Sequence, residues 1–284
     1  MQRGIVLTLL ALLCAPSCTK DQAQVERRAA AERKQARQAE LLRAVAKRIA
    51  PGEMKRVSKA RPVAEISPPK EKKSPTQLVA RCVERKGGRK LLAKVTALEA
   101  RLKLSGAHSL QTHTMIRYPD KLRVDYRAGG ELVRALIMNG ERAFSVMKGA
   151  WRELEGARLR DVRLAAAADT LAVLRVASRA GAKLSHLGSS AVRGQPAEVV
   201  RVELAGLGHA ALFIGVAKHD LLAVRYEASQ GLTTVIASKL KPVGGLLVSH
   251  ENRILVGAKE TVATLEKIEI NPRLSDDTFV VEKH

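Results

Sequence analysis

The sequence predicts an α+β domain that is dominated by one antiparallel sheet. Helical periodicity is confined to residues 76–96 and to a stretch near residues 159–180, while most of the remaining sequence after residue 96 alternates with a period of two. Turn-forming pairs such as Asn139-Gly140 separate strands that follow one another directly. Strands joined by tight turns pair in antiparallel fashion, because parallel pairing needs a long crossover.

The predicted domain begins with two short helices. Residues 76–86 have an amphipathic pattern that ends at Gly87-Gly88, and residues 89–96 form a second helix that leads into a strand at residues 98–104. Cys82 shares a helical face with Leu78, so we expect a small buried side chain and not a reactive thiol.

The strands that follow are indicated by the alternation of apolar and charged residues and by turn-forming residues between the strands. Leu122, Val124 and Tyr126 alternate with charged residues, which is typical of a half-buried strand. Asn139-Gly140 predicts a two-residue hairpin between residues 135–138 and 141–147. One helix is expected from about Leu159 to Ala180. Six further strands are expected at residues 198–204, 210–216, 221–227, 232–240, 246–250 and 262–270.

The first eighteen residues have the layout of a secretory signal peptide. Arg3 precedes an apolar run at residues 5–13, which is too short to span a bilayer. Ala15 and Ser17 then lead to Cys18, and this ending resembles the bacterial lipoprotein signal. The resemblance implies that residues 1–17 are the signal peptide and that Cys18 is the lipid attachment site. The alternative is ordinary signal-peptidase cleavage after a small residue.

Two segments separate this signal from the predicted domain at residues 76–284. Residues 18–50 are rich in Ala, Glu, Lys and Arg, which predicts a basic segment that is helical or disordered. Residues 51–75 contain five of the ten prolines, so they are expected to form an extended linker. Together the two segments would tether the domain to a membrane.

The net charge of +22 would suit a protein that binds nucleic acid, but other features of the sequence argue against that function. An exported chain does not normally meet a genome, and no aromatic residues are interleaved with the basic ones. Residues 19–75 hold 16 of the 50 Lys and Arg residues but only 7 of the 28 Asp and Glu residues. An anionic envelope surface is therefore the expected partner of this segment.

The sequence lacks the patterns of known catalytic and metal sites. The seven histidines are scattered without zinc-ligand spacing, Gly188-Ser-Ser190 does not match a nucleophile elbow, and no glycine-rich loop suits a phosphate. We therefore expect a non-enzyme with no catalytic residues, no metal and no cofactor.

Four blocks of the chain resemble the LolA/LolB superfamily of periplasmic carriers and outer-membrane receptors of lipoproteins. Their order and spacing over about residues 76–280 carry the resemblance. The blocks are the opening at residues 78–106, Ile116 to Tyr126, the pair at residues 194–202 and 221–226, and the ending from Ile268 to Phe279.

The resemblance implies an unclosed, curved antiparallel barrel whose concave apolar face lies under a lid of helices and shelters acyl chains. The expected ligands are lipid acyl chains or lipoproteins, at the periplasmic side of the envelope and with an outer-membrane anchor. Strand parity then suggests Leu122, Val124 and Tyr126 as lining residues, with Trp151 near the mouth and with Leu171 and Leu174 on the lid. Two alternatives stay open: these residues form an ordinary core, or the chain is a structural lipoprotein whose basic tail binds an anionic polymer or a partner.

Overall fold

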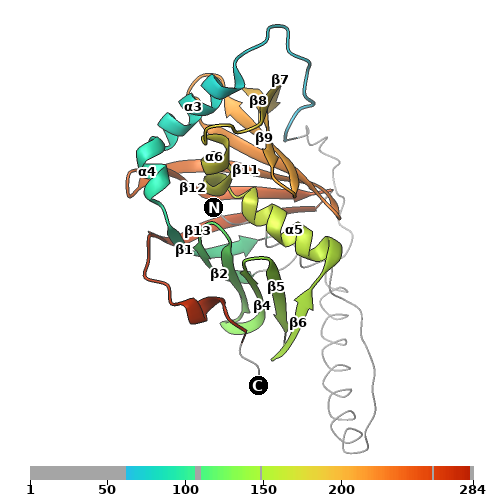
Figure 1. The fold of residues 1–284 in the computed structure, drawn as a ribbon, viewed down its shortest axis with the longest axis vertical. Coiled ribbons are helices and arrows are strands. Elements are labelled where there is room, and N and C mark those ends of the chain that lie inside the picture. The colour runs from blue at the N-terminus through green and yellow to red at the C-terminus, as the bar shows by residue number, and fades with distance from the viewer. Residues whose placement is uncertain (1–61, 106–109, 148, 258, 282–284) are drawn as a thin grey trace, which may run out of the picture. The chain divides into compact units, whose positions relative to one another are not determined.

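The structure is a computed structural model, and it describes residues 62–105, 110–147, 149–257 and 259–281. Its elements are labelled as in Figure 1. The helices are α3 (Pro75–Lys86), α4 (Arg89–Lys94), α5 (Gly156–Ala167), α6 (Thr170–Ala177) and the 3-10 helix η1 (Asp276–Phe279). The strands are β1 (Ala97–Ser105), β2 (Leu110–Arg117), β3 (Lys121–Ala128), β4 (Glu131–Asn139), β5 (Arg142–Met147), β6 (Ala150–Leu154), β7 (Leu184–Val192), β8 (Gln195–Leu204), β9 (Gly208–Gly215), β10 (Leu221–Ala228), β11 (Gly231–Val243), β12 (Leu246–Val256) and β13 (Lys259–Ile270).

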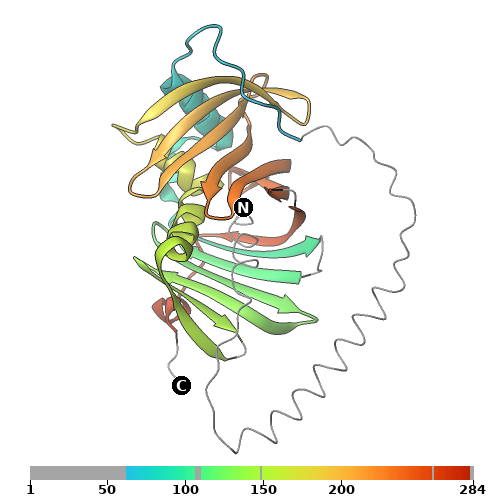
Figure 2. The same cartoon turned by 90° about the vertical axis from the view of Figure 1, so that its right-hand side faces the viewer.

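The thirteen strands form one antiparallel sheet in the order β6-β5-β4-β3-β2-β1-β13-β12-β11-β10-β9-β8-β7. The first and last strands therefore meet in the middle, where Leu98 pairs with Ile270 and Ser105 with Val262. The edge strands β6 and β7 do not pair with each other, so the sheet is unclosed. Figure 2 shows its two ends curving toward each other with the helices along one side. The predicted half-barrel with a helical lid is confirmed.

One face of the sheet, which we call the inner face, packs against the helices. Leu98, Leu122 and Val224 lie on it, and they belong to the same hydrophobic cluster as Val83 of α3 and Leu174 of α6. This cluster spans most of the described strands and each of the helices α3 to α6, which identifies the layer as the main hydrophobic core.

Two peripheral segments cover parts of the opposite, outer face. Val63 and Ile66 pack against outer-face residues of β8 to β11, and Val63 bridges Val192 of the edge strand β7. At the other end of the sheet, Phe279 of η1 is buried beneath Arg117 of β2. Residues 62–74 therefore contact the sheet, although the sequence indicated an extended linker up to residue 75. Edge pairing explains the difference, because Ala64 and Ser67, which lie between the prolines, donate backbone hydrogen bonds to the exposed edge of β7.

The single helix expected from Leu159 to Ala180 was wrong. Ala168 ends α5, and Asp169 starts α6 by accepting hydrogen bonds from the backbone N–H groups of Leu171 and Ala172, at 3.0 and 3.3 Å. An aspartate at an N-cap satisfies donors that a continuing helix would have paired. The strands β6 and β7 were not anticipated, because neither has a clean alternation of buried and exposed residues.

Candidate functional site

The inner face of the sheet is the candidate site, and β3 supplies three of the residues expected there. Leu122, Val124 and Tyr126 are buried in the main cluster. Leu122 pairs with Ile116 of β2 and with Met138 of β4, which are also in that cluster. The alternation seen in the sequence therefore places all three side chains on the face that packs against the helices.

The two residues expected on a lid lie on α6 and are buried in the same cluster. Leu171 and Leu174 are 0% exposed. The helix is fixed at Arg175, whose guanidinium donates a hydrogen bond to the carbonyl of Val95, where α4 ends and β1 begins. The same guanidinium lies 5.1 Å from the centroid of the Tyr118 ring. The structure thus brings five of the six predicted lining residues together.

Trp151 lies apart from these five, on the outer face of the edge strand β6. Its ring makes an edge-to-face contact with Phe144 of β5, with 6.0 Å between the centroids. Both rings line a cavity of about 260 Å³ together with Arg142 and Phe279. Leu154 pairs with Ala143, and both belong to the main cluster, so the side chain of Leu154 points to the inner face. Trp151 lies three residues earlier on the same strand, and its side chain therefore points to the outer face.

Polar side chains also lie on the inner face, near the turn between β3 and β4. Thr112, Tyr126 and Arg134 occupy facing positions on β2, β3 and β4. Arg134 donates a hydrogen bond to Ser145 at 3.2 Å, and its burial lowers the pKa of the guanidinium. Within the described residues, the hydroxyls of Thr112 and Thr114 have no hydrogen-bond partner. Sequence reasoning missed this group, although both threonines share the parity of Ile116.

Buried ionisable side chains lie on α3. Cys82 is 1% exposed, so its predicted burial is confirmed, and burial raises the pKa of its thiol to about 12. Lys86, one turn further along, is also buried, and desolvation lowers its pKa to about 8.

Two of the described histidines each lie beside a single carboxylate. His113 lies 2.7 Å from Glu99, and His186 lies 2.8 Å from Glu198. In the part of the chain that the structure describes, no group of three or more His, Cys, Asp or Glu side chains is arranged to hold a metal ion. Cys18 lies outside the described residues.

None of the helices in the described ranges combines the length and the hydrophobicity that a membrane-spanning helix needs.

Comparison with known proteins supports the fold through structure and not through sequence. No family model matches the chain. No curated protein matches it either. A solved DUF1329 family protein from Desulfovibrio piger is similar with a TM-score of 0.52 and 10% identity, covering 73% of this chain and 98% of that one. A LolA superfamily protein from Nitrosomonas europaea is similar with a TM-score of 0.50 and 9% identity, covering 74% and 99%.

These likenesses, together with the unclosed sheet and its covering helices, define a LolA/LolB-like fold. The resemblance found in the sequence is therefore confirmed at the level of the fold.

Proposed function

We propose that this chain is a non-catalytic envelope lipoprotein that shelters the acyl chains of a lipid or of a lipoprotein on its inner face. In this proposal Cys18 carries the lipid anchor, the domain works at the periplasmic side of the outer membrane, and the helices form the lid. Sorting of lipoproteins to the outer membrane is the process that such binding would serve.

One observation carries the proposal: the aliphatic side chains of the inner face and of the helices form one continuous cluster under an open-edged sheet. Each buried acyl CH₂ group contributes about 0.8 kcal/mol, so a long hydrocarbon chain that took the place of the helices against this aliphatic layer would be favoured. The likeness to a LolA superfamily protein supports the same ligand class.

Lipid extraction from the purified full chain tests the proposal. Mass spectrometry should find acyl lipid bound to the wild-type chain, and a fluorescent fatty acid should displace it. Ala100→Phe adds a ring to the inner face at a residue that is 1% exposed, and it should reduce bound lipid several-fold.

Ala135→Phe is the matched control. Ala135 is 2% exposed but lies on the outer face, where it pairs with Val146 next to Trp151. This variant should keep its lipid, although it should lose about as much thermal stability as Ala100→Phe does. A wild-type chain that neither carries lipid nor takes up the fatty acid would overturn the proposal, as would equal loss of lipid in both variants.

The alternative role is a structural or interaction lipoprotein, and the basic character of residues 19–75 favours it. A wild-type chain that purifies without lipid, but that binds anionic envelope polymer in a salt-sensitive manner, would support this second function.

A further inference from the structure

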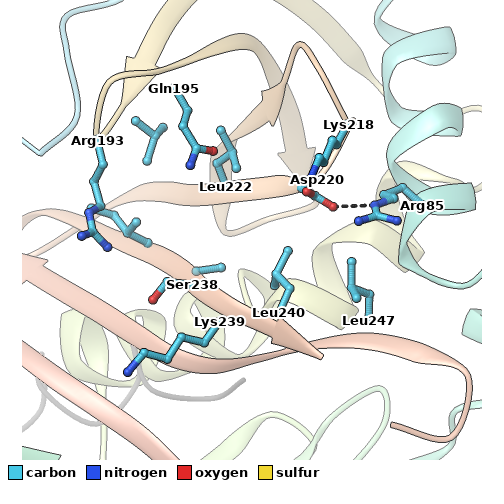
Figure 3. A pocket seen from close by; sticks show the side chains of 13 residues that line it. Arg85, Arg193, Gln195, Lys218, Asp220, Leu222, Ser238, Lys239, Leu240 and Leu247 are labelled. Carbon is cyan, nitrogen blue, oxygen red and sulfur yellow. Dashed lines mark hydrogen bonds and ion pairs between the residues drawn. The ribbon is translucent and has the colours of Figure 1, made fainter. Parts of the chain in front are cut away.

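Charged cavities also lie outside the inner face of the sheet. The first, which we call the basic pocket, has a volume of about 480 Å³ and lies between the β7–β8 and β9–β10 turns, β11 and the end of α3. Figure 3 shows Arg193 and Lys239 at one end of it and Lys218 and Arg85 at the other, with Asp220 beside Arg85. Since its cations are divided between two ends, the basic pocket does not present them to one anionic group.

A second charged cavity, which we call the edge groove, lies along β6 and the beginning of α5 (Figure 1). Its volume is about 570 Å³, and it is lined by Arg152, Glu153, Leu154, Glu155, Ala157 and Arg158. None of these lining residues belongs to β5, the strand that pairs with β6. The edge groove therefore lies on the free side of β6.

The backbone of β6 has unpaired polar groups on this side. β6 is the last strand at one end of the sheet, and among the described residues it pairs with β5 alone. The backbone N–H and C=O groups of successive residues in a strand point to opposite edges, so at least two of the five residues of β6 present theirs at the free edge. Such an edge is a template on which another strand can pair.

The opposite edge of the same sheet shows how such a template is filled. Ser67 and Ser189 exchange backbone hydrogen bonds at 2.8 and 3.0 Å, and Ala64 donates one to the carbonyl of Ala191 at 2.8 Å. An extended segment of the chain thus covers β7. In the described ranges, no segment covers β6 in this way, and the basic character of residues 19–75 does not suit a groove lined by arginines. We therefore expect the strand that pairs with β6 to come from another molecule.

The outer face of β6 is apolar. Strand edges that only prevent aggregation carry charged side chains. The ring of Trp151, however, is 42% exposed on this face, next to Phe144 and to a cavity of about 260 Å³. Side chains that lie opposite each other on paired strands are about 5 Å apart, so an added strand would place one side chain directly beside Trp151. An apolar side chain at that position would bury the exposed ring.

The inner side of β6 is basic. Arg152 has the parity of the buried Leu154, so it lies on the side of the strand on which α5 packs. In the described ranges, neither Arg152 nor Arg158 forms an ion pair with an acidic residue. Glu153 is held by Arg142 through two hydrogen bonds of 2.7 and 2.8 Å, which leaves Glu155 as the one other carboxylate of the lining. Charge complementarity therefore favours an acidic partner, whereas a second copy of this chain would bring two arginine-bearing edges together.

We propose that the free edge of β6 binds an extended acidic peptide as an added strand. Apolar residues of the peptide lie beside Trp151, and acidic residues alternate with them on the side of Arg152 and Arg158. Backbone hydrogen bonds to β6 supply affinity, and the alternation supplies selectivity. Because an extended peptide spans several residues, the two arginines do not need to hold the same carboxylate. This site is separate from the inner face and does not depend on the proposed acyl-chain binding.

Tryptophan fluorescence of the full chain tests the proposal, because Trp151 is the only tryptophan in the sequence. Titration with an acetylated hexapeptide of alternating glutamate and valine should shift the emission to shorter wavelength, since an added strand removes the ring from water. Binding to the basic segment at residues 19–75 would not produce this shift. If the emission does not shift, the edge of β6 does not take up the peptide and the proposal is wrong.

Two further peptides separate the contributions of charge and of backbone pairing. A hexapeptide of alternating lysine and valine should bind at least tenfold more weakly, because it places cations beside Arg152 and Arg158. The glutamate–valine peptide with a methyl group on every backbone nitrogen should also bind at least tenfold more weakly, because it cannot donate hydrogen bonds to β6. If the methylated peptide binds as tightly as the parent, strand addition is excluded.

A double variant, Arg152→Glu with Arg158→Glu, should weaken binding of the glutamate–valine peptide at least tenfold. The matched control is Arg101→Glu with Arg179→Glu, which changes the same charges at two exposed residues on β1 and after α6. The control should bind within twofold of the wild type. Equal weakening in the two double variants would assign the effect to net charge and would overturn the site.

The oligomeric state of the wild type distinguishes a peptide partner from a second copy. The chain should be monomeric by light scattering in the absence of peptide. A dimer whose tryptophan emission moves to longer wavelength on dilution would assign the edge of β6 to a second copy and would overturn the proposal. Failure of acyl-lipid binding at the inner face would leave these results unchanged.

Discussion

The phenol hydroxyl of Tyr118 donates a hydrogen bond to Oδ1 of Asp169 at 3.1 Å, and this bond joins the end of β2 to the cap of α6. Asp169 is buried and Tyr118 is half-buried, and desolvation raises the pKa of both the phenol and the carboxyl. The same carboxylate oxygen accepts the two backbone hydrogen bonds that begin α6. The carboxylate of Asp169 therefore connects the lid helix α6 to the end of β2.

Tyr118→Phe should destabilise the domain by about 1 kcal/mol, because it removes one hydrogen bond to a buried acceptor. Asp169→Ala should cost more, since it removes this bond and the helix cap together. Urea unfolding at pH 7 measures both. Thr170→Val, in which a neighbouring buried hydroxyl is removed, is the control and should cost less than Asp169→Ala. Equal destabilisation by Tyr118→Phe and Asp169→Ala would contradict the role of the cap.

Stability should rise with pH between about 8 and 10.5, owing to Lys86. Its pKa is lowered from 10.5 to about 8 by burial, so the unfolded chain binds more protons than the folded one across this window. The pKa difference corresponds to about 3 kcal/mol. Lys86→Met should therefore be more stable than the wild type at pH 7, and the gap should narrow as the pH approaches 10.5. Urea unfolding of both proteins at several pH values measures this difference. If the free energies of unfolding of the two proteins changed with pH in the same way, the pH dependence would not be due to Lys86.

Gly188→Ala should detach the N-terminal segment from β7. Gly188 has a φ of 123°, and a Cβ atom there would lie 2.0 Å from the carbonyl oxygen of Ser67. In the wild type, Ser67 and Ser189 exchange backbone hydrogen bonds at 2.8 and 3.0 Å. Hydrogen exchange at residues 62–69 should accelerate in the variant.

Gly194→Ala provides the control for backbone strain. Gly194 also has a positive φ, of 78°, but nothing lies within 4 Å of its added Cβ. If Gly194→Ala accelerates exchange at residues 62–69 as strongly as Gly188→Ala does, the steric explanation fails.

Phe279→Ala should destabilise the domain by about 3 kcal/mol, the usual cost of removing a buried phenylalanine. The ring is 1% exposed and lies 5.5 Å from the guanidinium carbon of Arg117. Val280→Ala, at a residue that is 49% exposed, should change the free energy of unfolding by less than 0.5 kcal/mol, roughly the range of surface substitutions. Chemical denaturation measures both, and similar effects would show that η1 does not anchor the C-terminal segment.

Cys18→Ala should abolish metabolic labelling with palmitate if Cys18 is the lipid attachment site. The expectation rests on the sequence from Ala15 to Cys18. Cys82→Ala is the control, because its thiol is buried and should not be acylated. Labelling that persists in Cys18→Ala would show that Cys18 is not the lipid attachment site.

Local sequence signals predicted those parts of the fold that local physics determines. The hairpin expected at Asn139-Gly140 does join β4 to β5, but its two turn residues are Gly140 and Glu141, because Asn139 still pairs with Arg142. Gly140, the first turn residue, has a positive φ of 62°. The alternation of Leu122, Val124 and Tyr126 correctly assigned the buried face of β3.

The parts that were missed depend on contacts between distant residues. Asp169 breaks the long helix because its cap is supported by Tyr118, 51 residues away. The basic pocket combines Arg85 with residues from 192 to 247, so no window of sequence contains it. Trp151 could be placed on either face of β6 from sequence alone, because the strand has five residues and only its last one is fully buried.

The pairing of β1 with β13 has a consequence for biosynthesis. Among the described strands, every other pairing joins neighbours in the sequence, so β1 to β6 and β7 to β13 each form by successive hairpins. Among the strands that the structure describes, only β13 joins the two halves of the sheet by backbone hydrogen bonds. A chain cut short before Lys259 would have two separate sheets, and the continuous inner face that they share would form only after β13 had been synthesised.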